Sequence, residues 1–436
     1  KELIKLKKFY GACNRVSTIM KLTKNSSLFE TIDFESKQKP YHLPVLNKKV
    51  LDLRTGKIIE RTKDHYFTFE IKARFDDNDI LKTTKRADKF FKKLMKEDEQ
   101  KIDLLQQILG SLITGEPLKY FYSFFGSTGD NGKSVLVNQI LYNCLGKYHR
   151  SIKKELILKR KFKNSGSSPE LLELKGGRIG ISSEINDGEH IDEEMFKTLT
   201  SGCDYIEARN HYQKNMTKFI NTSKPVVLLN KPFYLDTTDN ATKNRIINLE
   251  FNAEFKSHPK EGQYLQNPKL INFLTTPEGL SQCLSWICKG SIKFYKNNKT
   301  IISPILDEMK STFLNRIDPV SGFMKRVRFS DKFSDFYSRG EITRAFKGYI
   351  SGTQFSYNGK LRNKIYQEIE KHCKKIKNSV FGYRGLDINE DYEEDVEEEA
   401  DFIDNEKPET EIDYKSKYLE LLERFKILEN QIKVDA

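Results

Sequence analysis

The residues best suited to chemistry lie in a glycine-rich turn between two apolar segments, at residues 120–145 (YFYSFFGSTGDNGKSVLVNQILYNCL). Residues 120–125 form an aromatic run typical of a strand, and the apolar residues from Val135 onward follow helical spacing. Glycines allow backbone N–H groups to turn toward an anion, and a helix N-terminus adds partial positive charge. The order of strand, glycine turn, Lys133-Ser134 and helix therefore predicts a phosphate-binding loop, or P-loop.

The chemistry expected of this loop is nucleotide binding. Lys133 would neutralise the β- and γ-phosphates, and the Ser134 hydroxyl would be a ligand of Mg²⁺. Ser127 stands where the strict pattern has glycine, so an ordinary glycine turn between a strand and a helix is the alternative. The residues expected to bind the nucleotide are Gly126, Gly129, Asp130, Asn131, Gly132, Lys133, Ser134 and Val135.

Three later apolar segments carry polar residues at their ends. Residues 178–185 (RIGISSEI) contain Glu184, residues 226–229 lead to Asn230, and residues 245–251 begin with Arg245. Apolar strands separated by helices predict a mostly parallel sheet with the nucleotide at its carboxyl edge. Glu184 would polarise the attacking water or hold Mg²⁺, and Asn230 would orient water against the γ-phosphate. Arg245 would reach the nucleotide of a neighbouring subunit.

Each of these three residues also has a plain structural interpretation. In this interpretation Glu184 ends an ordinary strand and has no part in chemistry. Asn230 would then cap the turn before Pro232, and Arg245 would form a surface salt bridge.

The rest of the chain gives a coarse outline. A hairpin is expected over residues 42–69, around the turn at 54–56, and helices over residues 79–117 and 192–200. Residues 205–220 predict a second hairpin with a polar tip at 210–215. Further helices are expected at residues 305–316, 333–337 and 362–375.

Charge, cysteine content and apolar runs limit the classes of protein to which the chain can belong. The formal charge is +13, although residues 387–413 hold fifteen acidic side chains and one lysine, which leaves +27 for the rest. A basic body favours a polyanionic partner, with simple solubility as the alternative. The six cysteines form no CxxC pair, so neither structural zinc nor a disulfide framework is predicted, and a reducing compartment fits best. No apolar run reaches membrane-spanning length, and the opening at Lys1 predicts a fragment of a longer protein.

From residue 42 to about residue 289 the chain resembles the superfamily 3 helicases. The resemblance is to the primase–helicase branch of poxviruses and other large DNA viruses, which also occurs in phages and plasmids. The matching blocks occur in the family's order: LPVLNKKVLDLRTGKI, LLQQILGSLITGEPLKYFYSFFGSTGDNGKS, GRIGISSEI, FKTLTSGCDYIEARNHY, KPVVLLNKP, NRIINLEF and SQCLSWICKG.

This resemblance implies a hexameric ring that binds ATP and Mg²⁺ at each subunit interface. Lys133, Ser134, Glu184 and Asn230 would come from one subunit, and Arg245 from the next. Arg209 is a second candidate for the cation that clamps the phosphate charge. The hairpin at 205–220 would line the central channel, where two residues would contact the phosphates of one DNA strand, His211 and Lys214.

The resemblance also implies partners and a location. The partners would be single-stranded and forked DNA, other copies of the chain, and replication proteins such as a polymerase and a primase, with no membrane. The location would be a viral replication factory in the host cytoplasm.

The expected fold is α/β, with a P-loop, AAA+-like parallel-sheet ATPase core, a helical and β-stranded N-terminal region and a small, mainly helical, basic C-terminal domain. The expected divisions are an N-terminal region with a β-hairpin (1–78), a helical lead-in or collar (79–118), the ATPase core (119–255), a helical extension (256–300), a basic C-terminal domain (301–386), an acidic segment expected to be disordered (387–413) and an amphipathic C-terminal helix (414–436). For the basic C-terminal domain, a winged-helix-like module is one interpretation, and a small helical domain without DNA contact is the other.

The function expected from these observations is an ATP-dependent DNA helicase of viral replication, acting as part of a primase–helicase. Its 3′–5′ direction follows from the resemblance alone. One alternative is a nucleic-acid-stimulated P-loop ATPase that loads or packages DNA without unwinding it. Another is a non-catalytic DNA-binding scaffold with a degenerate loop, which Ser127 motivates.

Overall fold

The computed structural model describes residues 16–18, 33–75, 85–159, 168–182, 185, 189–211, 215–231, 233, 235, 240–330, 333, 335–351, 357, 359–373, 375–377 and 380–388. The chain divides into two compact units, 1–388 and 389–436. All described residues belong to the first unit. The expected C-terminal helix, and the expected acidic segment beyond Ile388, lie outside the described residues.

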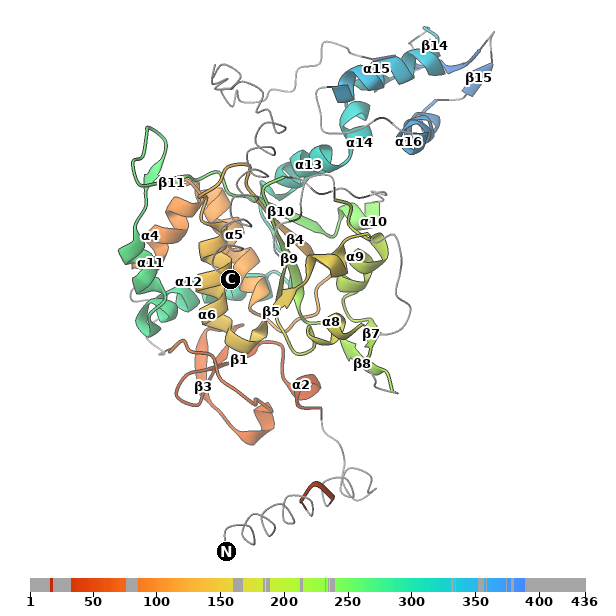
Figure 1. Cartoon of the computed structure of the whole chain (residues 1–436). Helices are drawn as coiled ribbons and strands as arrows, with labels where there is room; N and C mark the ends of the chain where they lie inside the picture. The colour runs from red at the N-terminus through yellow and green to blue at the C-terminus, as the bar shows by residue number, and fades with distance from the viewer. Residues whose placement is uncertain are drawn as a thin grey trace, which may run out of the picture. The chain divides into compact units, whose positions relative to one another are not determined.

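A five-stranded parallel sheet forms the centre of the fold (Figure 1). Its strands are β4 (Phe121–Phe125), β5 (His149–Ile152), β6 (Ile179–Ser182), β9 (Lys224–Leu229) and β10 (Ile246–Glu250). Their order across the sheet is β10-β4-β9-β6-β5, and every neighbouring pair is parallel. This confirms the predicted α/β class with a parallel sheet.

Strands β4 and β9 are buried on both faces, because each of them supplies side chains to two different cores. On β4, Tyr122 and Phe124 belong to one hydrophobic cluster, whereas Phe121 and Phe125 belong to another. Alternate residues of a strand point to opposite faces, so a strand covered on both sides reads as a continuous apolar run. Strands β4 and β9 are buried along their whole length for this reason.

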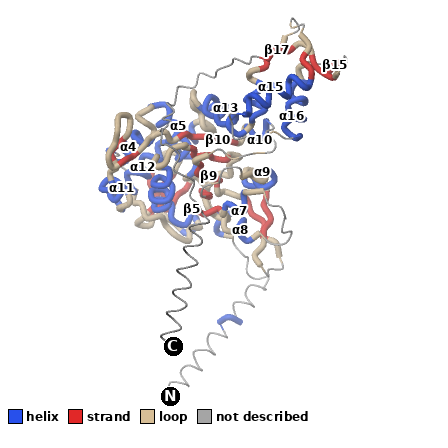
Figure 2. The backbone as a smooth tube through the Cα atoms, turned by 45° about the horizontal axis from the view of Figure 1, so that its top comes forward, coloured by secondary structure: helices blue, strands red, loops and turns tan. Residues whose placement is uncertain are grey.

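Helices cover both faces of the sheet (Figures 1 and 2). One side holds α4 (Lys85–Leu94), α5 (Glu99–Leu112), α11 (Pro268–Leu274) and α12 (Pro277–Lys296). The helix after β4 also lies in this core; it comprises a π-helical stretch, η2 (Val135–Leu141), then α6 (Tyr142–Leu145) and the 3₁₀ turn η3 (Gly146–Tyr148). Helices α5 and α12 approach so closely that a Cβ on Gly290 would lie 1.8 Å from the Gln106 carbonyl oxygen.

The second core lies on the other face of the sheet. It is built from α7 (Lys154–Ile157), α8 (Pro169–Leu172), α9 (Glu193–Leu199) and α13 (Leu306–Ile317), together with the antiparallel hairpin of β7 (Tyr205–Ala208) and β8 (Thr217–Ile220). The hairpin confirms the prediction for residues 205–220. The short helix α10 (Asn240–Lys243) precedes β10, and the two-residue parallel strands β11 (Phe255–Lys256) and β12 (Tyr264–Leu265) follow it.

The N-terminal region is α2 (Phe34–Lys37) and an antiparallel sheet of β1 (His42–Val45), β2 (Lys49–Asp52) and β3 (Lys57–Glu60), followed by the 3₁₀ turn η1 (Lys63–His65). Two fully buried cations, Arg178 and Lys224, connect the amino edge of the parallel sheet to strand β1 and to the segment after α5. Arg178 Nη1 donates to the Ile113 carbonyl at 2.6 Å and Nη2 to the His42 carbonyl, while Lys224 Nζ donates to the Thr114 carbonyl. Burial holds the pKa of Lys224 well below its usual range, and the Arg178 charge adds to this.

The C-terminal part has its own hydrophobic core. Its elements are α14 (Pro319–Met324), β13 (Val327–Phe329), β14 (Tyr337–Ser338), α15 (Arg339–Ser351), α16 (Gly359–Glu370), β15 (Lys375–Lys377), β16 (Phe381–Tyr383) and β17 (Leu386–Ile388). Two expectations need correction here. The helix expected at 333–337 is wrong, because Tyr337 begins strand β14, and the helix expected at 362–375 ends at Glu370. Within the described residues, no helix is both long and apolar enough to cross a membrane.

Replacing Gly290 by alanine tests the close packing of α5 on α12. The added methyl group has no space against the Gln106 carbonyl, so we expect a loss of stability of about 1–3 kcal/mol. Trp286, the only tryptophan, stacks on Phe91 at 3.9 Å between ring centroids, so its fluorescence reports unfolding of this layer. The variant Gly290→Ala should lower the urea midpoint of that signal.

The matched control is Gly348→Ala, which also lies inside a helix but in open space. Alanine is the better helix former, so the Trp286 midpoint should not fall. An unchanged midpoint for Gly290→Ala would contradict the packing described for α5 and α12.

Candidate nucleotide site

The glycine loop follows the carboxyl end of β4 and has an unusual backbone conformation. Asp130 and Gly132 have φ values of +58° and +83°, in the left-handed region. The residues from Ser127 to Asp130 are exposed, whereas Asn131 is buried. The Asn131 amide donates to the Thr128 carbonyl, and its oxygen accepts from the Lys133 N–H at 3.4 Å. Asn131 therefore holds the loop from within, while the residues from Ser127 to Asp130 remain exposed.

Lys133 lies at the centre of the loop and is 4% exposed. Its Nζ donates to the Gly126 carbonyl and to Asn230 Oδ1, both at 2.9 Å. Strands β4 and β9 are parallel neighbours, so their carboxyl ends lie side by side and bring together two residues 97 positions apart. Both of these acceptors are neutral oxygens, which the oxygens of a bound phosphate can replace.

The start of the following helix supplies further groups for an anion. Ser134 is exposed in its first turn, and Val135 is half-buried beside it. The helical hydrogen bonds begin with the Leu136 N–H, which donates to the Gly132 carbonyl at 3.0 Å. The N–H groups of Ser134 and Val135 precede this bond, at the positive end of the helix, where phosphate groups commonly bind. The residues present therefore fit a nucleotide polyphosphate.

Gly126 is required because a Cβ has no space there, and Gly132 is required by its left-handed backbone. A Cβ on Gly126 would lie 2.5 Å from Asn131 Nδ2 and 2.9 Å from Lys133 Nζ. A Cβ on Gly132 would lie 2.5 Å from a Leu94 methyl group. Gly129, by contrast, has no atom within 4 Å of the position its Cβ would take.

Arg245 lies at the opposite edge of the sheet from the loop. Its carbonyl accepts from the N–H of Phe121, the first residue of β4, and its Nη1 donates to Thr200 Oγ1 at 3.1 Å. The five residues of β4 separate that edge from the glycine loop by roughly 16 Å. Arg245 therefore does not reach the loop of its own chain. Among the described residues its side-chain partner is a hydroxyl and not a carboxylate.

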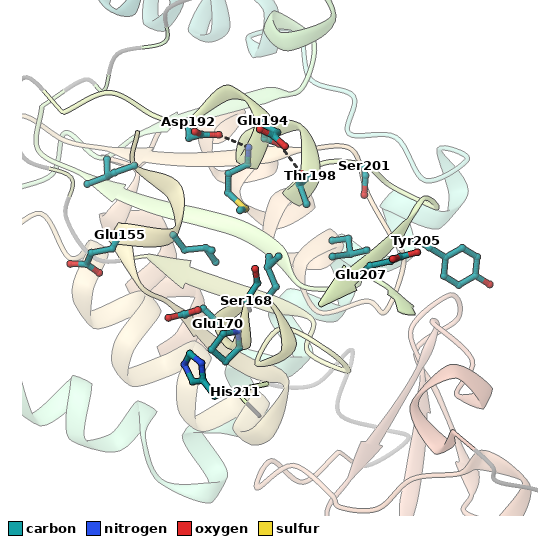
Figure 3. Close-up of a pocket in the computed structure, with 16 residues that line it drawn as sticks. Glu155, Ser168, Glu170, Asp192, Glu194, Thr198, Ser201, Tyr205, Glu207 and His211 are labelled. Carbon is teal, nitrogen blue, oxygen red and sulfur yellow. Dashed lines mark hydrogen bonds between the residues drawn. The ribbon is translucent and has the colours of Figure 1, made fainter. Parts of the chain in front are cut away.

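A separate cavity of about 690 Å³ lies between α7, α8, α9 and β7 (Figure 3). His211 lines this cavity, and the Arg209 carbonyl accepts from the Ser168 N–H at its rim. Five acidic side chains also line it: Glu155, Glu170, Asp192, Glu194 and Glu207. The DNA contact expected for His211 stays a prediction.

Two expected residues, Glu184 and Lys214, lie outside the described residues. The strand that leads to Glu184 is described: β6 ends at Ser182, opposite Val227 of β9. The chain therefore leaves β6 at the same sheet edge that holds Lys133 and Asn230. Ser134 is the one expected Mg²⁺ ligand whose position is described.

No protein-family model matches the chain. Two viral proteins named as putative helicases match part of it. One, from Acanthamoeba polyphaga mimivirus, is 27% identical over 183 residues, and one, from Invertebrate iridescent virus 6, is 30% identical over 170 residues. These matches cover 42% and 38% of this chain but only 18% and 17% of the two relatives, so the chain aligns with less than a fifth of their length.

Two apo structures of the C-terminal region of NrS-1 also match, with TM-scores of 0.44 and 0.37 and 12% identity. They cover 80% and 78% of this chain, and 83% and 82% of the matched chains. In sequence, the chain is similar to helicase-named proteins of large DNA viruses.

The variant Gly126→Ala tests the geometry of the loop. Its methyl group would displace Asn131 and Lys133 from their positions, so we expect the affinity for a fluorescent ATP analogue to fall by about tenfold or more. The comparison variant is Gly129→Ala, whose methyl group enters open space, and its loss should be clearly smaller. Equal losses in the two variants would contradict the assigned role of the Gly126 position.

Proposed function

We propose that the chain is the motor of a superfamily 3 DNA helicase that hydrolyses ATP with Mg²⁺ in viral DNA replication. The observation that carries the proposal is the Lys133 ammonium group, held between the glycine loop and Asn230 at the carboxyl edge of a parallel sheet. The names of the two viral relatives support the choice of a helicase over other P-loop enzymes.

The roles of the chain's own residues follow from their positions. Lys133 and the N–H groups at the start of the helix bind the phosphates, because these positive groups converge on the exposed loop. Asn230 exchanges its contact with Lys133 for one with the attacking water, which lies beside the terminal phosphate. Mg²⁺ supplies charge neutralisation on the phosphates when bound; Ser134 and Glu184 are the proposed ligands.

Arg245 is proposed to act on the nucleotide of a neighbouring subunit. Its place at the amino edge of the sheet, far from the loop of its own chain, supports a role in trans. A closed ring, proposed as a hexamer, would give every subunit such a neighbour. Arg209 is the second candidate for this clamp.

DNA contact is proposed for the hairpin of β7 and β8, through Lys214 at its tip. Contacts with phosphates position a strand without reading its sequence, which suits a translocating motor. The C-terminal part offers a second surface: Arg362 and Asn363 are exposed in the first turns of α16, and Phe381 is exposed under the ammonium group of Lys375. Binding of DNA to this basic part stays a proposal, as does its winged-helix-like character.

The decisive experiment measures ATP hydrolysis with and without single-stranded DNA, strand displacement on a forked duplex, and particle mass in solution. The expected result is DNA-stimulated hydrolysis and unwinding by a ring-sized particle. Lys133→Ala should lower the hydrolysis rate by about 10² or more, because the phosphates lose their principal cation. Hydrolysis without strand displacement would instead support a motor that loads or packages DNA.

A mixing experiment tests the trans role of Arg245. Arg245→Ala and Lys133→Ala should each be inactive alone, because each interface needs both residues. Mixed at equal amounts with free exchange of subunits, about one quarter of the interfaces of a ring would hold an intact pair, so hydrolysis should partly return. No recovery at any ratio, with exchange shown by labelled subunits, would exclude action in trans.

A further inference from the structure

The glycine loop is held by a segment that lies far from it in the sequence. After β10 the chain turns back over the loop, and two consecutive residues of β11 contact Asp130. The Phe255 N–H donates to the Asp130 carbonyl at 3.0 Å, and Lys256 Nζ pairs with Asp130 Oδ2 at 3.1 Å. Both polar ends of Asp130, which has a left-handed backbone, are therefore bound by one strand.

Strand β11 is itself well anchored, so the position of Lys256 is set by the fold. The Gln266 N–H donates to the Lys256 carbonyl at 2.9 Å, and the Gln266 amide donates to the Phe255 carbonyl at 2.8 Å. The Phe255 ring packs against Tyr264 of β12 with centroids 5.7 Å apart. The Lys256 ammonium is therefore presented at the rim of the phosphate loop.

The pair of Lys256 and Asp130 can be exchanged for another anion. Both side chains are partly exposed, at 40% and 56%, and an ion pair of this kind contributes little to stability. A nucleotide polyphosphate on the loop carries more negative charge than one carboxylate and lies beside it. The same charge that attracts Lys256 is repelled by Asp130, so both effects favour an exchange of partners.

We propose that Lys256 is a second phosphate-binding residue of the nucleotide site, held by Asp130 when the loop is empty and transferred to the phosphates when nucleotide binds. Asp130 then acts as an internal competitor of the nucleotide. This inference rests on the proposed function, because it requires the glycine loop to bind a nucleotide. It adds a cation that the P-loop pattern does not contain.

The test is the affinity for fluorescent ATP and ADP analogues in Lys256→Ala, Lys256→Arg and Asp130→Asn. Lys256→Ala should weaken ATP binding by about tenfold, and Lys256→Arg should retain it, because a charge-assisted hydrogen bond is lost in the first and kept in the second. Asp130→Asn should tighten ATP binding, since the competing and repelling charge is removed. The same loss for Lys256→Ala should persist in the Asp130→Asn background.

The sign of the Asp130→Asn effect separates this role from a purely structural one. If Lys256 and Asp130 only brace the loop, breaking the pair from either side loosens it, and both variants weaken binding; that result would overturn the proposal. Lys260→Ala is the matched control: an exposed lysine before β12 that forms no ion pair with any described residue, and it should leave affinity unchanged.

Two measurements made in parallel keep the outcomes distinct. Trp286 fluorescence must show the same unfolding midpoint in each variant, so that misfolding is not read as lost affinity. Lys133→Ala reports on the nucleotide site as such. If Lys133→Ala abolishes binding and Lys256→Ala leaves it unchanged, only the role of Lys256 fails. If neither Lys133→Ala nor Lys256→Ala lowers the nucleotide affinity, the proposed function fails together with the role of Lys256.

Discussion

The parallel pairing of β4 with β9 is the constraint on which the rest of the site depends. Because the two strands run in the same direction as neighbours, their carboxyl ends meet, and the loop after one faces the asparagine after the other. Residues of both strands alternate between the two hydrophobic clusters, so a shift by one residue would exchange their places and disturb the packing of both cores. Core packing thereby sets the distance between Lys133 and Asn230.

The two edges of the sheet have different characters. At the amino edge, Arg178 and Lys224 are fully buried and satisfied by backbone carbonyls of the β1 strand and the segment after α5. Removing either cation would leave buried carbonyls without partners, which is costly. At the carboxyl edge, the loop is exposed and held by exchangeable contacts. The buried, fixed contacts thus lie at the amino edge, and the exposed, exchangeable contacts lie at the edge that carries the glycine loop.

Local patterns of apolar residues in the sequence predicted several strands and the hairpin. The elements that the sequence did not predict depend on contacts between residues far apart in the chain. Strands β4 and β9 and the hairpin of β7 and β8 could be predicted because each has a clear apolar or alternating run. Strand β5 was missed because only Ile152 of its four residues is buried. Residues 333–337 resembled a helix, but Tyr337 pairs with Tyr383. Lys256 carries no local signal, since its partner lies 126 residues away.

The two outer strands of the parallel sheet, β10 and β5, also affect how copies of the chain can associate. Strand β10 at one edge is packed by α13, and β5 at the other has only four residues, including the half-buried Arg150, whose guanidinium donates to the Lys175 carbonyl. A short edge strand with a charged residue is a poor template for another strand. Pairing of another strand with the β5 edge is therefore disfavoured, which protects this edge against fibrous aggregation.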